Sequence, residues 1–269
     1  MEDVKGRKKE EEDKDPLRLG LVKHTRLSGG ANGNIYLASI GRRYYTLKTY
    51  DTSFTAEGKW QRSAKALARL PIHHGWPTVW VAWKDHVLMD FVPGKDLFET
   101  RGLRGNSGAV FSIGVQVLEI LGFLHSKGLA HKDVKPENIM VHDGVATLVD
   151  MEETSPFTPT LQEANESVGT PLFMSKSRFD TKMYYSPWED FYALGLTLVD
   201  VFTAGVCQKD AMYRTEIGQL EAPCHALLEQ WRVQKARASE ELGYLVEVLL
   251  RDHAPKRMEA LDLVAPETD

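Results

Sequence analysis

Residues 130–139 read AHKDVKPENI, and this stretch decides how the rest of the chain is interpreted. It supplies a carboxylate at Asp133, an ammonium group at Lys135 and an amide at Asn138. Pro136 prevents these residues from forming an ordinary helix. A carboxylate can accept the proton of an attacking hydroxyl, a cation can offset charge on a moving phosphoryl group, and an amide oxygen can bind Mg²⁺. The stretch therefore predicts a loop for phosphoryl transfer, whereas a His-x-Asp triplet alone would indicate only a polar turn.

The segment before this loop agrees with that interpretation. Apolar residues fall on one helical face at Val110, Val117, Leu121 and Leu124. Residues 110–125 therefore predict a core helix that leads directly into the loop and gives it rigid support.

The segment after the loop predicts a hairpin. Mostly apolar runs at 139–141 and 145–149 flank the sequence His-Asp-Gly at 142–144, and Asp-Gly between apolar runs is a strong hairpin signal. Such a hairpin returns Asp150 to the neighbourhood of Asn138. An amide oxygen and a carboxylate there would suit a Mg²⁺ ion bound to phosphate groups.

The loop sequence resembles the His-Arg-Asp-Leu-Lys-Pro-Glu-Asn signature of eukaryotic protein kinases, and lysine at position 135 resembles their serine/threonine branch. The resemblance covers about residues 21–261. It implies an α+β, bilobal protein-kinase fold over residues 17–269. The β-rich N-lobe is expected at about 17–91 and the mostly helical C-lobe at about 95–261.

Upstream, a glycine-rich turn joins two short strand-like segments and is followed by Lys48 on a third. Backbone N–H groups at a turn with few side chains can approach phosphates, and a lysine on the next strand can reach the α- and β-phosphates. Alone, such a turn is more often an ordinary β-turn. Its position resembles the kinase glycine-rich loop, with Ser28 at the first glycine position. The resemblance implies nucleotide binding by Leu27, Ser28, Gly29, Gly30, Ala31, Asn32, Gly33, Asn34 and Ile35.

The carboxylate partner of Lys48 is less obvious from the sequence. Residues 55–70 predict a helix that ends before Pro71 and corresponds, by resemblance, to the kinase C-helix. The resemblance places Ser63 where the family has the glutamate that pairs with this lysine. Either Glu57 pairs with Lys48 or the ion pair is missing. We expect Glu57, because a cationic lysine without any carboxylate would be poorly held.

Residues 78–83 and 86–91 predict two strands whose tryptophans are expected in the sheet core. The stretch that follows resembles the kinase hinge. By that resemblance Met89 is the gatekeeper residue, and Asp90 and Val92 present backbone groups to adenine. The boundary between the lobes is expected near residues 91–95.

Asp150-Met151-Glu152 stands where the family has Asp-Phe-Gly. The acid is retained, so the resemblance implies that Asn138 and Asp150 hold Mg²⁺, and Met151 can still pack as an apolar plug. Glu152 replaces a glycine and either points into the metal site or lies at the surface. We expect the surface, because a third buried carboxylate would be costly without a second cation.

Polar residues 152–168 resemble an activation segment, and Gly169-Thr170 begins a stretch like the family's substrate-side loop. Ser175-Lys176-Ser177 stands where Ala-Pro-Glu would follow, a departure that casein kinase I and vaccinia-related kinases share. Asp190 resembles the acid that braces the catalytic loop. Helical patterns follow at 191–202, 224–233 and 240–251.

Composition bounds the remaining possibilities. The 269 residues are 42% hydrophobic with net charge −5, so nothing favours nucleic acid or an anionic membrane as an obligatory partner. Cys207 and Cys224 alone form neither a disulfide framework nor paired zinc spacing. Residues 1–16 predict a disordered charged tail. With no apolar run of about 18 residues, we expect no membrane span and a cytoplasmic or nuclear protein. The sequence does not indicate an oligomeric state.

The resemblance as a whole implies a serine/threonine protein kinase that uses ATP and Mg²⁺ to phosphorylate a protein substrate. Asp133 would orient the substrate hydroxyl, Lys135 would stabilise the γ-phosphoryl group, and Lys48 would hold the α- and β-phosphates. The altered residues also allow a pseudokinase, which uses the same fold as a scaffold or regulator. A small-molecule phosphotransferase of kinase-like fold is a third alternative.

Overall fold

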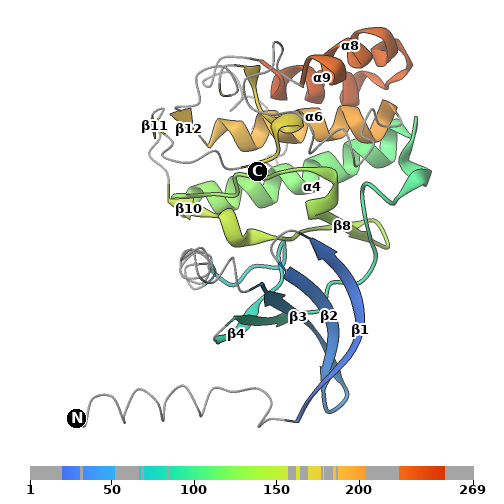
Figure 1. Cartoon of the computed structure of the whole chain (residues 1–269). Helices are drawn as coiled ribbons and strands as arrows, with labels where there is room; N and C mark the ends of the chain where they lie inside the picture. The colour runs from blue at the N-terminus through green and yellow to red at the C-terminus, as the bar shows by residue number, and fades with distance from the viewer. Residues whose placement is uncertain are drawn as a thin grey trace, which may run out of the picture. The chain divides into compact units, whose positions relative to one another are not determined.

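The computed structural model describes residues 20–30, 33–51, 67, 70–83, 85–156, 162–163, 169–176, 178, 184–185, 187–203 and 224–251. The chain divides into two compact units, Met1–Val92 and Pro93–Asp269. The first unit is rich in strands and the second is mostly helical (Figure 1). This confirms the predicted α+β class.

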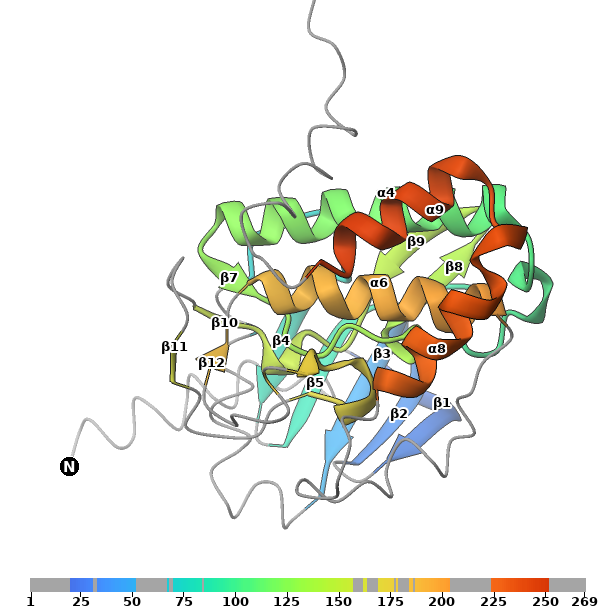
Figure 2. The same cartoon turned by 90° about the horizontal axis from the view of Figure 1, so that it is seen from above.

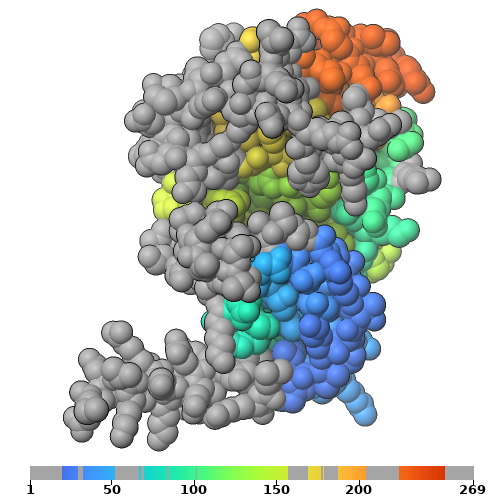
Figure 3. Space-filling view, in the orientation of Figure 1, coloured from blue at the N-terminus to red at the C-terminus, as the bar shows by residue number. Residues whose placement is uncertain are grey.

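The first unit contains a five-stranded antiparallel sheet with the order β1-β2-β3-β5-β4. Its strands are β1 (Leu21–Gly30), β2 (Gly33–Ile40), β3 (Arg43–Tyr50), β4 (Val79–Trp83) and β5 (His86–Asp90). Ala38, Leu47 and Leu88 form its buried core cluster, since alternate strand residues point to the same face. The blue atoms of β1 and β2 form much of the surface of this unit in the space-filling view (Figure 3).

The tryptophans of β4 do not share one environment. Trp83 packs against the core cluster, whereas Trp80 is 52% exposed, so the prediction that it lies in the sheet core is wrong. The two residues are three positions apart, and a strand with a two-residue repeat directs them to opposite faces.

The predicted helix over 55–70 lies almost entirely outside the described residues, and so do Glu57 and Ser63. Within that range the structure describes Leu67, which is helical and buried, and Leu70, whose N–H donates to the Leu67 carbonyl at 3.3 Å. The partner expected for Lys48 therefore stays a prediction.

The second unit is built on helix α4 (Ser107–Ser126). The Asn106 side chain caps its start by accepting a hydrogen bond from the Ala109 N–H at 3.2 Å. The predicted apolar face is confirmed, because all four of its residues are buried. Among the described residues, α4 is the one helix long and apolar enough to cross a membrane, but it packs against α6 (Trp188–Thr203) as a core helix does.

Helix α6 is buried along nearly its whole length, as its apolar sequence predicts. It lies beside α4 and also packs against α8 (Cys224–Gln234) and α9 (Glu240–Leu249), as Figures 1 and 2 show. Ser239 caps α9 by accepting a hydrogen bond from Leu242 N–H at 3.3 Å. These helices confirm the predicted C-terminal helical patterns.

A three-stranded sheet of order β6-β8-β9 contains the predicted hairpin. Strands β8 (Ile139–His142) and β9 (Val145–Leu148) are joined by Asp143 and Gly144, both with positive φ, as a tight hairpin turn requires. Gln116 of α4 clamps this hairpin: its amide donates to the Gly144 carbonyl, and its oxygen accepts from Ala146 N–H, each at 2.9 Å.

Short elements complete the described part of the second unit. They are β6 (Lys95–Asp96), η2 (Arg101–Leu103), β7 (Leu129–Ala130), η3 (Pro136–Asn138), η4 (Met151–Glu153), β10 (Ser155–Pro156), β11 (Gln162–Glu163), η5 (Pro171–Phe173), β12 (Tyr184–Tyr185) and η6 (Lys235–Arg237). Strand β7 pairs with β10, and β11 pairs with β12. The pairing of β7 with β10 brings residues on the two sides of the catalytic loop together.

Candidate active site

The backbone of the catalytic loop is held by one buried carboxylate. Asp190, at the start of α6, accepts hydrogen bonds from the N–H groups of His131 and Lys132, each at 2.8 Å. His125 Nε2 lies 2.8 Å from the same carboxylate. Lys132 has a φ of 75°, a region that costs a non-glycine residue about 1–3 kcal/mol. Asp190 therefore stabilises a strained backbone at the point where the loop turns, as the resemblance implied.

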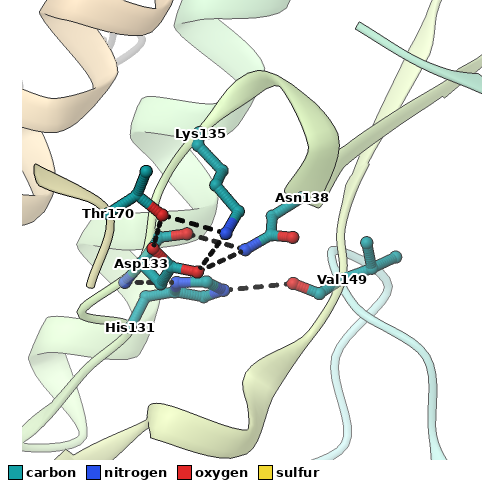
Figure 4. Close-up of polar contacts among 6 residues, drawn as sticks. All are labelled: His131, Asp133, Lys135, Asn138, Val149 and Thr170. Carbon is teal, nitrogen blue, oxygen red and sulfur yellow. Dashed lines mark hydrogen bonds and ion pairs between the residues drawn. The ribbon is translucent and has the colours of Figure 1, made fainter. Parts of the chain in front are cut away.

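His131 links the loop to the end of the β8–β9 hairpin (Figure 4). Its Nδ1 lies 3.2 Å from Asp133 N–H, and its Nε2 lies 3.2 Å from the Val149 carbonyl. Because Nδ1 accepts from an N–H group, the proton of the neutral ring belongs on Nε2, which then donates to the carbonyl. The buried imidazole thus fixes both the loop and the segment that precedes Asp150.

The Asp133 carboxylate is held from three directions (Figure 4). Thr170 donates its hydroxyl proton to Oδ1 at 2.7 Å, and Lys135 Nζ lies 2.7 Å from Oδ2. Asn138 Nδ2 donates to Oδ2 at 3.2 Å and to the Asp133 carbonyl at 2.8 Å. Lys135 Nζ also donates to Thr170 Oγ1 at 3.0 Å. The structure therefore brings Asp133, Lys135 and Asn138 together, and it adds Thr170 to them.

Asn138 and Asp150 are placed by the hairpin that separates them in sequence. The Val149 N–H donates to the Asn138 carbonyl at 2.8 Å, so the residue next to Asp150 is paired with Asn138. The Asn138 amide nitrogen faces Asp133, which directs its oxygen the other way (Figure 4). An amide oxygen and an exposed carboxylate fit Mg²⁺, which prefers oxygen ligands and completes its shell with water and phosphate. The described residues contain no cluster of three or more His, Cys, Asp or Glu side chains that could hold another metal.

The residues after Asp150 correct one expectation. Met151 is buried and can act as the apolar plug, but Glu152 is only 8% exposed and is not a surface acid. Asp150 adopts the left-handed conformation, and the tight turn η4 directly after it places both Met151 and Glu152 inside. The cost of burying a charge predicts a surface position, but the left-handed turn, which the sequence does not reveal, places Glu152 inside.

The substrate-side loop, residues 169–175, runs against the catalytic loop. Gly169 has a φ of 99°, and a Cβ atom there would lie 2.6 Å from the Lys132 carbonyl oxygen, so only glycine fits. Thr170 follows at once and reaches Asp133. At the other end, Ser175 is bonded to Glu189 of α6. Thr170 and Glu189 were not predicted as site residues. The Gly-Thr pair could have indicated Thr170, whereas the only sequence signal for Glu189 was its position beside Asp190.

The residues expected to bind nucleotide phosphates lie in the first unit. Strands β1 and β2 pair Ser28 with Ile35, Gly29 with Asn34, and Gly30 with Gly33, while Ala31 and Asn32 are outside the described residues. A Cβ atom on Gly33 would lie 1.9 Å from the Thr49 carbonyl oxygen, so this position requires glycine. Lys48 is opposite Ile35 on β3 and is buried. The turn and the lysine are therefore neighbours within one sheet.

The hinge-like residues Asp90 and Val92 lie at the end of the first unit. The Asp90 side chain is bound on the sheet: Oδ1 accepts from Trp80 Nε1 at 2.8 Å and from Arg43 at 2.9 Å, and Oδ2 accepts from Thr78 N–H at 3.3 Å. Burial alone would raise the pKa of Asp90, but these hydrogen bonds outweigh it and lower the pKa. Sequence reasoning assigned a role only to the Asp90 backbone and missed this side-chain cluster.

Two charged groups near the catalytic loop are perturbed by burial. Burial lowers the pKa of the Lys132 ammonium, with Asp190 opposing the effect and Arg178 adding to it. Burial raises the pKa of the Glu137 carboxyl, against the favourable effect of Lys135. The loop therefore contains two different carboxylates: that of Asp133 is hydrogen-bonded, whereas that of Glu137 is buried and poorly solvated.

A fixed carboxylate, a lysine and an amide lie together on one loop, and these are the groups that phosphoryl transfer uses. The family model for the protein kinase domain matches residues 25–267. The chain therefore belongs to the protein kinase domain family.

Individual relatives cover smaller parts of the chain. It is 28% identical over 200 residues to the serine/threonine-protein kinase AfsK of Streptomyces griseus, covering 69% of this chain and 24% of that protein. It is 25% identical over 190 residues to serine/threonine-protein kinase C of Synechocystis, covering 67% and 33%. It is 26% identical over 214 residues to calcium-dependent protein kinase 8 of Arabidopsis thaliana, covering 76% and 39%. The chain thus spans well under half the length of these relatives.

Proposed function

We propose that this chain is a serine/threonine protein kinase that transfers the γ-phosphoryl group of ATP to a hydroxyl group of a protein substrate. The observation that carries the proposal is the Asp133 carboxylate, held by Thr170, Lys135 and Asn138 at hydrogen-bonding distance. A carboxylate fixed in this way accepts a proton without having to reorganise. The names of the relatives AfsK and serine/threonine-protein kinase C support the same reaction.

In the proposed reaction, the substrate hydroxyl oxygen forms a bond to the γ-phosphorus while the bond from that phosphorus to the ADP oxygen breaks. The hydroxyl proton passes to Asp133, and the Lys135 ammonium stabilises negative charge on the moving group. Thr170 orients the carboxylate through Oδ1, so that Oδ1 and Oδ2 have different partners. Asp133 and Lys135 are thus the proposed catalytic residues.

ATP and Mg²⁺ are the proposed cofactors. Asn138 and Asp150 would hold the ion, which would neutralise phosphate charge when bound. Lys48 would contact the α- and β-phosphates, and residues 27–35 would cover the phosphates with backbone N–H groups. Backbone groups of Asp90 and Val92 would bind adenine.

A pseudokinase is the alternative, because Ser28 stands at a glycine position and a buried Glu152 follows the proposed metal ligand Asp150. The direct test incubates the purified chain with γ-radiolabelled ATP, Mg²⁺ and a general protein acceptor, and then identifies the phosphorylated amino acid. We expect label on serine or threonine, lost on chelation of Mg²⁺. Thermal stabilisation by ATP and Mg²⁺ without any transfer would instead support the pseudokinase.

A further inference from the structure

Two consecutive acids at the start of α6 hold two different loops. Asp190 binds the backbone of the catalytic loop, and Glu189, the residue before it, binds Ser175 at the end of the substrate-side loop. Both carboxylates are buried. One rigid helix end therefore determines where each loop lies.

The Glu189 contact is two-pronged. The Ser175 hydroxyl donates to Oε1 at 3.0 Å, and the Ser175 N–H donates to Oε2 at 3.4 Å. The same hydroxyl accepts a hydrogen bond from the Arg178 N–H at 3.2 Å, so the backbone beyond the loop is tied to it as well. Hydrogen bonds to an ionised, desolvated carboxylate are stronger than those between neutral groups. A glutamate buried beside Ser175 is thus suited to fix the end of the loop.

The other end of the substrate-side loop is already attached to the catalytic loop. Gly169 packs on the Lys132 carbonyl, and Thr170 bonds to Asp133. Residues of both loops and of α6, among them Thr170, Phe173 and Glu189, line one small cavity. The position of the substrate-side loop relative to Asp133, the proposed base, is therefore fixed at both ends of the loop.

We propose that Glu189 is a positioning residue for the protein acceptor, and this inference rests on the proposed kinase function. The chain has Ser175-Lys176-Ser177 where the resemblance leads one to expect Ala-Pro-Glu, so that motif's carboxylate is absent from the loop. Here the carboxylate comes from α6 and its partner, Ser175, from the loop. Glu189 holds the substrate-side loop in register with Asp133 and does not itself touch the reacting atoms.

The test is a double-mutant cycle on Glu189→Ala and Ser175→Ala, with KM measured separately for ATP and for the protein acceptor. Each single variant should lower kcat/KM for the acceptor about tenfold, mainly through KM, and leave KM for ATP within about twofold. The double variant should be no worse than Glu189→Ala alone, because that variant already removes both hydrogen bonds to Ser175, whereas Ser175→Ala removes only the hydroxyl bond. Glu189→Gln keeps one acceptor oxygen for Ser175 and should give an intermediate loss.

The matched control is Glu119→Gln on the exposed face of α4, which should match the wild type. Ser175→Ala and Glu189→Gln make small changes in volume, so they test the contact even where Glu189→Ala does not fold. Additive losses, unchanged acceptor KM, or an equal rise in KM for ATP would overturn the assignment of Glu189 while leaving the kinase proposal intact. Absence of transfer by the wild type would overturn the kinase proposal and the acceptor role together.

Discussion

Asp190 and Asp90 perform the same task in the two units but in opposite surroundings. Each carboxylate gathers donors from separate segments: Asp190 from the catalytic loop and α4, and Asp90 from β3 and the region of β4. The Asp190 side chain is 1% exposed, whereas that of Asp90 is 31% exposed and its partner Arg43 is 57% exposed. The geometry is similar, and the access of water differs.

This difference decides how much each cluster contributes to folding. When a buried carboxylate is removed, its donors stay away from water and lose their partners, which costs about 1–3 kcal/mol for each neutral donor. When an exposed carboxylate is removed, water replaces it, and exposed ion pairs contribute only about 0–1 kcal/mol. Two carboxylates with similar hydrogen-bonding geometry therefore contribute differently to stability.

The largest expected effect is that of Asp190→Asn. In the wild type, both oxygens of Asp190 accept from N–H donors. The amide of the variant must place its NH₂ group opposite one of these donors, so we expect a loss of about 3–5 kcal/mol in the free energy of unfolding. Urea unfolding of the variant and the wild type measures it. Asp143→Asn, on a side chain 89% exposed at the hairpin turn, is the matched control and should change stability little. A loss below about 1 kcal/mol for Asp190→Asn would contradict the ranking by burial.

Glu137 is a third carboxylate to compare, because it is buried but has no surrounding hydrogen-bond donors from other described residues. Both of its oxygens are buried, and neither has a hydrogen-bonding partner in another described residue. Burial raises its pKa above the ordinary 4.5, so the folded state binds the proton more tightly than the unfolded state. Stability from this group is therefore present at low pH and is lost as pH rises from 4.5 through the raised pKa.

Glu137→Gln removes this titration. We expect the variant to be more stable than the wild type at neutral pH, with the difference shrinking as pH falls towards 4.5. Thermal unfolding at a series of pH values measures the difference. A variant less stable than the wild type at neutral pH, or a difference that does not depend on pH, would show that the enclosed charge is not the cause.

The smallest expected effect is that of Asp90→Asn. Its hydrogen bonds hold the pKa of Asp90 below the ordinary 3.8, so its contribution is present above that pH and is lost as pH falls through the lowered pKa. Because water screens the cluster, we expect the free energy of unfolding to fall by about 0.2–1 kcal/mol. Added salt should reduce this loss further. A salt-independent loss as large as that of Asp190→Asn would break the comparison.

The sequence predicted the elements whose signals are local. Periodic apolar residues predicted α4, a nearly continuous apolar run predicted α6, and Asp143-Gly144 predicted the hairpin that places Asp150 near Asn138. The catalytic loop itself was recognised because its chemistry lies within residues 131–138.

The resemblance implied the contact of Asp190 with the catalytic loop, but two other contacts between residues distant in sequence were not predicted. Thr170 reaches Asp133 across 37 positions, and Glu189 reaches Ser175 across 14, and neither spacing follows from a helix or strand repeat. Glu152 was placed outside because burying its charge is costly, yet the left-handed turn at Asp150 carries it inward. Trp80 was predicted to be buried because of its residue type. However, the strand repeat directs its side chain to the face opposite that of Trp83, where it is exposed.

The central claim is that Asp133 accepts the proton of the acceptor hydroxyl, and the most direct measurement is single-turnover phosphate transfer by Asp133→Asn. The variant should bind ATP and Mg²⁺ as the wild type does, because Asp133 addresses the acceptor, and should lose transfer by at least about 100-fold. Asp143→Asn should transfer at the wild-type rate. Transfer by Asp133→Asn at the wild-type rate would contradict the assignment.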